Sequence, residues 1–347
     1  MKFEAVTIKD IAKALGLSTS TVSRAIRDHY AIKPDTRQLV LDYAKKINYH
    51  PNPIALSLRE KRSRSIGIII SEIANNFFSQ NINGIESIAH KEGYTVIISQ
   101  TGESYDREVL TAQFLSSRSV DGILVSVATE TKDFSHITEL YNRGLPIVCF
   151  DRVIDELDTH KVVVDSAKGA YDGVIHLAGN GYKRIAFICS SESVPVTRDR
   201  LKGYEKALAD KNILFRDDYF IQFPPGDLTY KELEQRINKM MKMKNRPDAV
   251  FIASDKLTTN FVRYCRLNNI SVPDQIAIAG FSNLDVSDIF NPSLTVIQSP
   301  AFELGEAAAQ LLIKMIESKR PVTKFETRVL DTQLIIRESS AKRKKKK

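Results

Sequence analysis

The sequence lacks any apolar run long enough to cross a membrane, since no stretch approaches about 18 uninterrupted apolar residues. Its first residues, Met1-Lys2-Phe3-Glu4, also lack the apolar segment of a secretory signal. Only three cysteines are present, and none has the spacing of a metal site or a redox pair. We therefore expect buried, reduced thiols and a cytoplasmic protein without a membrane partner.

Motifs for enzymatic chemistry are missing as well. No G-x-G-x-x-G or G-x-x-x-x-G-K-[ST] segment follows a candidate strand, so dinucleotide and NTP binding have no motif behind them. The six histidines follow no pattern, and no Ser/His/Asp or paired-carboxylate arrangement can be placed. The sequence therefore predicts no cofactor, no metal site and no enzyme.

Positive charge is concentrated at the two ends of the chain, whose net charge is +8. Residues 1–63 contain twelve basic and six acidic residues, and residues 342–347 are all basic, which leaves the middle mildly acidic. A basic head on an acidic body is typical of a polyanion-binding module joined to a domain of another kind. The tail, 341–347, is interpreted as a disordered charge run, with salt-sensitive DNA affinity as the alternative.

Residues 7–27 have the pattern of two short helices joined by a turn. Thr7 and Asp10 stand as a capping box, Gly16 supplies the turn, and Ser18 caps the second helix. The second helix leaves a face of short polar and basic residues, formed by Thr19, Ser20, Ser23, Arg24 and Arg27. Such a face suits the major groove, because small hydroxyls approach base edges and arginine forks onto guanine. On periodicity alone, an ordinary pair of helices remains the alternative.

This segment resembles the N-terminal signature of the LacI/GalR family of bacterial transcription regulators, roughly T-x-x-D-I/V-A-x-x-x-G-V/L-S-x-x-T-V-S-R. The matching positions are Thr7, Asp10, Ala12, Gly16, Ser18, Thr21, Val22, Ser23 and Arg24. Further blocks resemble the family over the rest of the chain, among them 121–125, 181–186, 200–204 and 334–340. The resemblance implies a sequence-specific DNA-binding regulator, expected to be a repressor that binds a pseudo-palindromic operator as a homodimer. A small-molecule effector, expected to be a carbohydrate, would control it.

The resemblance also implies roles in DNA binding. Thr19, Ser20 and Arg24 would reach bases, whereas the residues expected to contact phosphates or fix the register are Lys9, Ser18, Ser23 and Asn52. A third helix beginning near Pro34 completes a headpiece over 1–50, and 51–64 forms a hinge helix and linker. In the family's hinge pattern Ala55 is the small residue and Leu58 the wedge that opens a base step in the minor groove. Alternatively, the leucines of this segment pack the linker onto the body.

From residue 65 onward, buried-strand runs alternate with amphipathic segments in two batches, which predicts an α/β body of two similar lobes. The expected strands are 66–70, 95–99, 122–127, 146–150, 161–164, 184–189, 220–223, 249–253, 276–280 and 295–297. The resemblance implies a periplasmic-binding-protein-like body of two Rossmann-like lobes over 65–340, for effector binding and dimerisation. Lobe 1 is expected at about 65–163 plus 293–324, and lobe 2 at about 164–292 plus 325–340. The crossovers would then lie near Val164, Pro292 and residue 325.

Candidate effector contacts follow the expected strands, because ligands bind at the carboxyl ends of strands in such sheets. The family's contacts correspond to Asn76, Phe78, Asp151, Arg200, Ser254, Ser282 and Gln298. The chain departs from the family at Ser282, where an aspartate is usual, and at Ser254, where an asparagine is usual. The missing carboxylate at 282 indicates an effector other than a simple neutral sugar, or one bound through other groups, and Arg198 with Arg200 would suit an acidic or phosphorylated ligand.

Three other functions are compatible with parts of this pattern. They are a sugar-modifying enzyme on the same body, a solute-binding protein, and a regulator that a partner protein controls. The first two are disfavoured by the missing motifs, the missing signal and the basic head. No leucine heptads follow Ser340, which favours a dimer over a tetramer.

Overall fold

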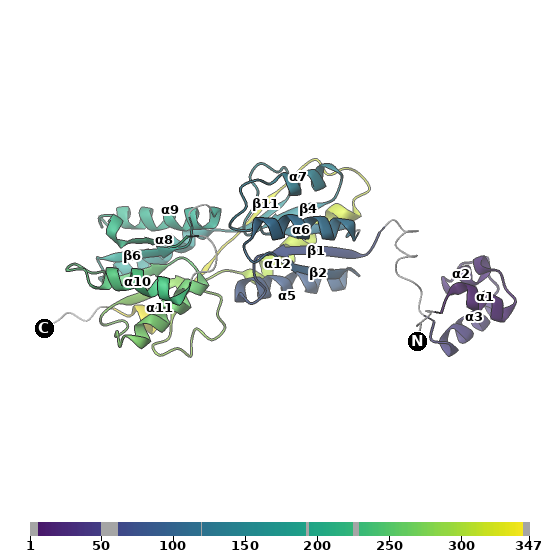
Figure 1. The fold of residues 1–347 in the computed structure, drawn as a ribbon, viewed down its shortest axis with the longest axis horizontal. Coiled ribbons are helices and arrows are strands. Elements are labelled where there is room, and N and C mark those ends of the chain that lie inside the picture. Colours follow the sequence, from purple (N-terminus) through teal and green to yellow (C-terminus); the bar gives the residue numbers. More distant parts are fainter. Residues whose placement is uncertain (1–5, 50–61, 119, 192–193, 225–228, 343–347) are drawn as a thin grey trace. The chain divides into compact units, whose positions relative to one another are not determined.

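The computed structural model describes residues 6–49, 62–118, 120–191, 194–224 and 229–342. The chain forms two compact units, Met1–Ser63 and Arg64–Lys347 (Figure 1). Within the described ranges, no helix is both long and apolar enough to cross a membrane.

The first unit is a bundle of three short helices around a small apolar core. The helices are α1 (Ile8–Leu15), α2 (Thr19–Ile26) and α3 (Pro34–Lys46). All three contribute to the core, which contains the buried residues Ile11, Ala12, Val22, Ala25, Val40 and Ala44. The apolar stripes of the three helices therefore face one another, and the polar side of α2 stays outside.

Local contacts define the ends of α1 and α2. Asp10 Oδ2 accepts hydrogen bonds from the Thr7 N–H (2.8 Å) and the Thr7 hydroxyl (2.7 Å). Gly16 ends α1 with a φ of 63°, a left-handed conformation that glycine adopts without steric cost. Ser18 Oγ accepts from the Thr21 N–H at 3.1 Å and caps α2. The predicted capping residues and turn are confirmed.

The second unit has two lobes, each built on a six-stranded sheet. In lobe 1 the strand order is β11-β5-β4-β3-β1-β2, and all pairings are parallel. These strands are β1 (Ser65–Ile70), β2 (Thr95–Gln100), β3 (Gly122–Val125), β4 (Ile147–Phe150), β5 (Lys161–Val164) and β11 (Thr327–Leu330). Helices α5 (Asn76–Lys91) and α12 (Ala301–Glu317) cover one face of this sheet. The other face is covered by α6 (Tyr105–Ser117) and α7 (Ser135–Asn142) (Figure 1).

Lobe 2 repeats this layered arrangement with the strand order β12-β10-β9-β8-β6-β7. Its strands are β6 (Ile185–Cys189), β7 (Phe220–Gln222), β8 (Ala249–Ile252), β9 (Ala277–Phe281), β10 (Thr295–Gln298) and β12 (Gln333–Ile335). Helices α8 (Ser166–Gly179) and α9 (Pro195–Asp210) cover one face, and α10 (Tyr230–Met241) and α11 (Asp255–Leu267) cover the other. The three cysteines are buried and unpaired, as expected.

The chain passes between the lobes at three places, two of which differ from the prediction. Strand β10 pairs with β9, so it belongs to lobe 2, and the second crossover lies between Gln298 and Ala301 instead of near Pro292. Strand β11 pairs with β5 in lobe 1, so the third crossover lies after Leu330 instead of near residue 325. The expected lobe limits at 292 and 325 are therefore wrong. β11 and β12 were not predicted because they are short, contain few apolar residues, and lie at sheet edges.

Candidate nucleic-acid interface and ligand cavity

Helix α2 presents its polar face to solvent. Thr19, Ser20 and Arg24 are exposed, whereas Val22 and Ala25 on the opposite side are buried. Lys9 is exposed on α1, and Ser18 is exposed at the start of α2. Six of the predicted DNA-binding residues thus lie in one small unit: Lys9, Ser18, Thr19, Ser20, Ser23 and Arg24.

Hydrogen bonds within α2 already engage part of this polar face. Arg27 donates from its guanidinium to the Ser23 carbonyl (2.8 Å) and to the Ser23 hydroxyl (2.7 Å). The Ser18 and Ser20 hydroxyls lie 2.8 Å apart. Arg24 is exposed in the last turn of α2, so its guanidinium is a long donor on this face. The predicted contacts Asn52, Ala55 and Leu58 and the tail residues 343–347 lie outside the described residues.

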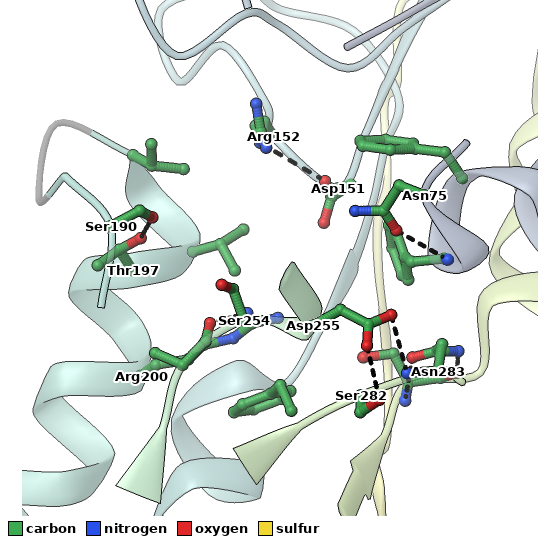
Figure 2. A pocket seen from close by; sticks show the side chains of 17 residues that line it. Asn75, Asp151, Arg152, Ser190, Thr197, Arg200, Ser254, Asp255, Ser282 and Asn283 are labelled. Carbon is green, nitrogen blue, oxygen red and sulfur yellow. Dashed lines mark hydrogen bonds and ion pairs between the residues drawn. The ribbon is translucent and has the colours of Figure 1, made fainter. Parts of the chain in front are cut away.

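A cavity lies between the two lobes of the second unit, at the carboxyl ends of several strands. Figure 2 shows acidic, basic and amide side chains turned toward it from both lobes. Five of the predicted effector contacts line this one cavity: Phe78, Asp151, Arg200, Ser254 and Ser282. These residues are distant in sequence, from the start of α5 to the end of β9. They meet because the carboxyl ends of the strands lie around one cavity, so their positions after strands predicted the site.

Arg200 lies on α9 and forms the cationic side of the cavity. One guanidinium nitrogen donates to the Ala253 carbonyl at 2.6 Å, and the guanidinium lies 3.6 Å from the centre of the Phe281 ring. Burial lowers the pKa of Arg200 to about 10, although Asp151 partly offsets this effect. Its Nε is buried and has no hydrogen-bond partner within the described part of the chain.

Asp151 and Arg152 follow β4 and enter the cavity wall together. Asp151 has a φ of 58°, an uncommon backbone conformation for a residue with a side chain. Its carboxylate accepts from the Ser126 hydroxyl at 3.3 Å and lies 3.9 Å from Arg152 Nε. Burial raises the pKa of Asp151, and the nearby Arg152 and Arg200 oppose that change. Besides the Ser126 hydroxyl, the carboxylate can accept a further hydrogen bond from a ligand.

Arg152 is held by Glu103, a residue that the sequence analysis did not identify. The guanidinium donates to Glu103 at 2.6 Å, and the Thr129 N–H and hydroxyl donate to the same carboxylate at 2.8 and 2.6 Å. Burial disfavours the charged form of Glu103, but Arg152 and Thr129 outweigh it and lower its pKa to about 2. The signal in the sequence is the arginine at 152, directly after Asp151. A buried arginine needs its own counter-ion, so a further carboxylate such as Glu103 is expected nearby.

Asp255 supplies a second carboxylate at the first position of α11. Its two oxygens accept from the Ser282 hydroxyl (2.6 Å) and from the Asn283 N–H (3.4 Å) (Figure 2). Burial raises the pKa of Asp255, and these hydrogen bonds oppose the rise. At position 282 the family usually has an aspartate, which this chain replaces with serine. Asp255 thus places a carboxylate beside Ser282.

Asn283 connects this carboxylate to the opposite lobe. Its side-chain amide donates to Gln80 Oε1 on α5 at 2.8 Å, and Gln80 Nε2 donates back to the Asn283 carbonyl at 3.2 Å. Gln80 Nε2 also lies 3.1 Å from Asp285 Oδ1. Asn283 is almost completely buried. The lobes are therefore joined by hydrogen bonds directly behind the ligand-facing side of Asp255.

Two predicted effector contacts lie elsewhere. Asn76 lines a neighbouring pocket with Lys256, and its place at the cavity is taken by Asn75, which caps α5 by accepting from the Phe77 N–H at 2.9 Å. Gln298 lines a separate pocket at the crossover after β10. Among the described residues, no group of three or more His, Cys, Asp or Glu side chains is arranged to hold a metal ion.

Comparison with known proteins finds family matches in two parts of the chain. Residues 7–52 match the family described as bacterial regulatory proteins, lacI family, and residues 174–340 match a periplasmic binding protein-like domain. The chain is 30% identical to catabolite control protein A of Priestia megaterium over 315 residues, covering 90% of this chain and 93% of that protein. It is 29% identical to the HTH-type transcriptional repressor PurR of Vibrio campbellii, covering 94% and 96%. Among solved structures, a complex of the transcriptional regulator CelR with cellobiose matches with a TM-score of 0.70 and 25% identity, covering 96% and 99%.

Proposed function

The chain belongs to the LacI family of bacterial regulatory proteins, and we propose that a small carbohydrate bound between its two lobes controls its affinity for operator DNA. Like these relatives, it is a transcriptional repressor of that family and not an enzyme. The observation that carries the proposal is the mixed donor and acceptor character of the cavity around Arg200, Asp151 and Asp255.

A polyhydroxylated ring fits this chemistry. Each hydroxyl donates one hydrogen bond and accepts others, so one ligand can serve the Arg200 donors and the carboxylates of Asp151 and Asp255. The partly exposed ring of Phe77 lines the same cavity and adds apolar surface on which a sugar face can pack. The cellobiose bound by the CelR structure supports a sugar as the ligand class.

The charge balance of the cavity opposes an acidic ligand. Glu103 neutralises Arg152, which leaves Arg200 to balance both Asp151 and Asp255. An added anion would meet this excess of carboxylate in a partly buried site. Arg198, which together with Arg200 suggested an acidic ligand, is exposed and does not line this cavity. We therefore propose a neutral sugar or glycoside.

The DNA-binding part of the proposal rests on α2 and its surroundings. We propose that Thr19, Ser20 and Arg24 read bases, and that Lys9, Ser18, Ser23 and Asn52 contact phosphates. Ala55 and Leu58 would form the minor-groove contact of the hinge segment. Two copies of the chain, each supplying one such unit, would read the two half-sites of a pseudo-palindromic operator. A coupling of roughly 1–3 kcal/mol between effector and operator is enough for regulation.

A thermal-shift screen against neutral sugars, sugar acids, sugar phosphates and purines tests the effector proposal. A ligand at about 100 times its Kd should stabilise the protein by roughly 2.7 kcal/mol, which raises the Tm by a few degrees. Arg200→Ala should abolish the shift, because it removes the cavity donors, whereas Arg198→Ala two residues earlier should retain it. Stabilisation by sugar acids alone, or an unchanged shift in Arg200→Ala, would contradict the proposal.

A further inference from the structure

Among the large hydrophobic residues described in the DNA-binding unit, the most exposed lies just after α2. Tyr30 is 94% exposed, whereas Leu39 on α3 is 52% exposed and Val6 is 40% exposed. The Tyr30 ring stacks on the neighbouring His29 ring, with 4.5 Å between ring centres and 24° between planes. The stack gives the unit an aromatic platform that the function described so far does not use.

The platform is fixed to the unit on both sides. The His29 N–H donates to the Arg24 carbonyl at 3.1 Å, which holds the pair against the last turn of α2. On the other side the Ile32 N–H donates to the His29 carbonyl at 3.0 Å, and Ile32 packs on the core. Because both flanks are anchored, the loop loses little conformational entropy when a partner binds it.

The donors that this loop offers outward come from its side chains. The Ala31 N–H donates to His29 Nδ1 at 3.2 Å, so a neutral His29 ring carries its proton on Nε2. Backbone N–H groups of residues 29, 31 and 32 are used inside the loop and cannot bind a partner. The His29 Nε2–H and the Tyr30 hydroxyl remain as donors for an acceptor-rich surface.

The length of α2 brings this loop to the wall of the major groove. The helix has eight residues and is therefore about 12 Å long, which equals the width of the major groove, about 12 Å. In helix-turn-helix complexes the N-terminal residues of the recognition helix contact base edges, and in the related homeodomain the C-terminal end of that helix contacts the sugar-phosphate backbone. The basic residues Arg24 and Arg27 beside the loop give this end a charge complementary to phosphate.

We propose that the His29–Tyr30 pair is a sequence-independent contact to the DNA backbone, with His29 Nε2–H and the Tyr30 hydroxyl donating to phosphate oxygens. The surface is continuous with the polar face of α2, so DNA bound there reaches it without a second partner. Phosphate offers only acceptors, which matches a platform whose outward groups are donors. Tyr30 lies outside the apolar core, and His29 supports the loop through Nδ1, so the Tyr30 hydroxyl and the His29 Nε2–H can both donate to phosphate.

Full-length protein and two duplexes of equal length test this proposal. One duplex is an operator selected by the wild-type protein from a random library, and the other is a scrambled sequence. Tyr30→Ala and His29→Ala should each weaken binding to both duplexes by a similar factor, about tenfold, because hydrogen bonds to charged groups are lost on any sequence. The slope of log Kd against log salt should not change, since no cation is removed.

Leu39→Ala is the matched control, because it removes an exposed apolar side chain from the same unit on α3, and it should leave both affinities within twofold. Tyr30→Phe keeps the stacked ring and should lose most of the affinity that Tyr30→Ala loses. Wild-type affinity in Tyr30→Ala and His29→Ala would overturn the proposal. A loss confined to the operator would also overturn it, because it would indicate base reading.

Discussion

Glu103 supports the cavity through Arg152 without lining it. The two side chains are largely buried, with exposed fractions of 26% and 17%, and their charged atoms lie 2.6 Å apart. Removing one partner of such a pair leaves the other charge buried without a counter-ion, which is more harmful than replacing both. Arg152 adjoins Asp151, so an unpaired Arg152 would also disturb a ligand-facing carboxylate.

Glu103→Gln should therefore destabilise the second unit at neutral pH. The folded pKa of Glu103, about 2, lies below its ordinary value of 4.5, which corresponds to roughly 3 kcal/mol of stability. This stability is fully present above pH 4.5 and is lost as the pH falls toward 2. Urea unfolding of wild type and variant should show a difference of that order at pH 7. The difference should shrink between pH 4.5 and 2, and a constant difference across this range would contradict the assignment.

Single-residue placement shows how far the sequence could predict the cavity. Asp151 and Arg200 were identified because charged residues at strand ends and helix starts of such a sheet face the cleft. Asn76 was preferred to Asn75, since a sequence does not show which of two adjacent amides caps the helix. Asn283 and Glu103 act through hydrogen bonds to residues far away in sequence, Gln80 and Arg152, and no local pattern marks such pairs.

At the scale of elements, the contact between α5 and α12 depends on two glycines. A Cβ added at Gly84 would lie 2.0 Å from the Phe302 carbonyl oxygen, and one at Gly305 would lie 2.1 Å from the Asn81 carbonyl oxygen. Both clashes are with backbone, which cannot turn away as a flexible side chain can. The two helices therefore pack backbone to backbone on one face of the lobe 1 sheet.

Gly305→Ala should consequently force α5 and α12 apart and lower the stability of the second unit by about 1–3 kcal/mol or more. The matched control is Gly179→Ala at the end of α8, where an added Cβ meets nothing within 4 Å. That control should be neutral or stabilise slightly, because alanine restricts the unfolded chain. Thermal unfolding measures both, and equal Tm values for the two variants would show that the helices separate without cost.

The elements themselves were mostly predictable, and the exceptions have a physical reason. The ten expected strands correspond to strands in the structure, because most are apolar runs buried between two layers of helices. The two strands that were not expected, β11 and β12, are short edge strands without a fully buried residue, and so short a pattern does not separate them from loops. The errors in the lobe limits follow from these two strands and from β10.

At the scale of the whole molecule, the proposed homodimer needs a surface on the second unit. Leu110 and Phe114 lie four residues apart on α6 and are 65% and 48% exposed, so they share one face of the helix. This helix packs beside β2, the edge strand of the lobe 1 sheet, where Ile98 is 40% exposed. Exposed apolar side chains grouped at a sheet edge are typical of a surface that another protein covers.

Leu110→Asp should weaken the dimer, because it places a charge where the partner copy would bury an apolar side chain. Sedimentation velocity should show the dimer dissociating at a concentration at least about tenfold higher than in wild type. Operator affinity should fall with it, because a monomer contacts one half-site alone. Leu214→Asp is the matched control, since Leu214 is 83% exposed in lobe 2, between α9 and β7. If both variants sediment as wild type does, the α6 face is not the dimer surface. If both dissociate alike, the effect comes from the added charge and not from this face.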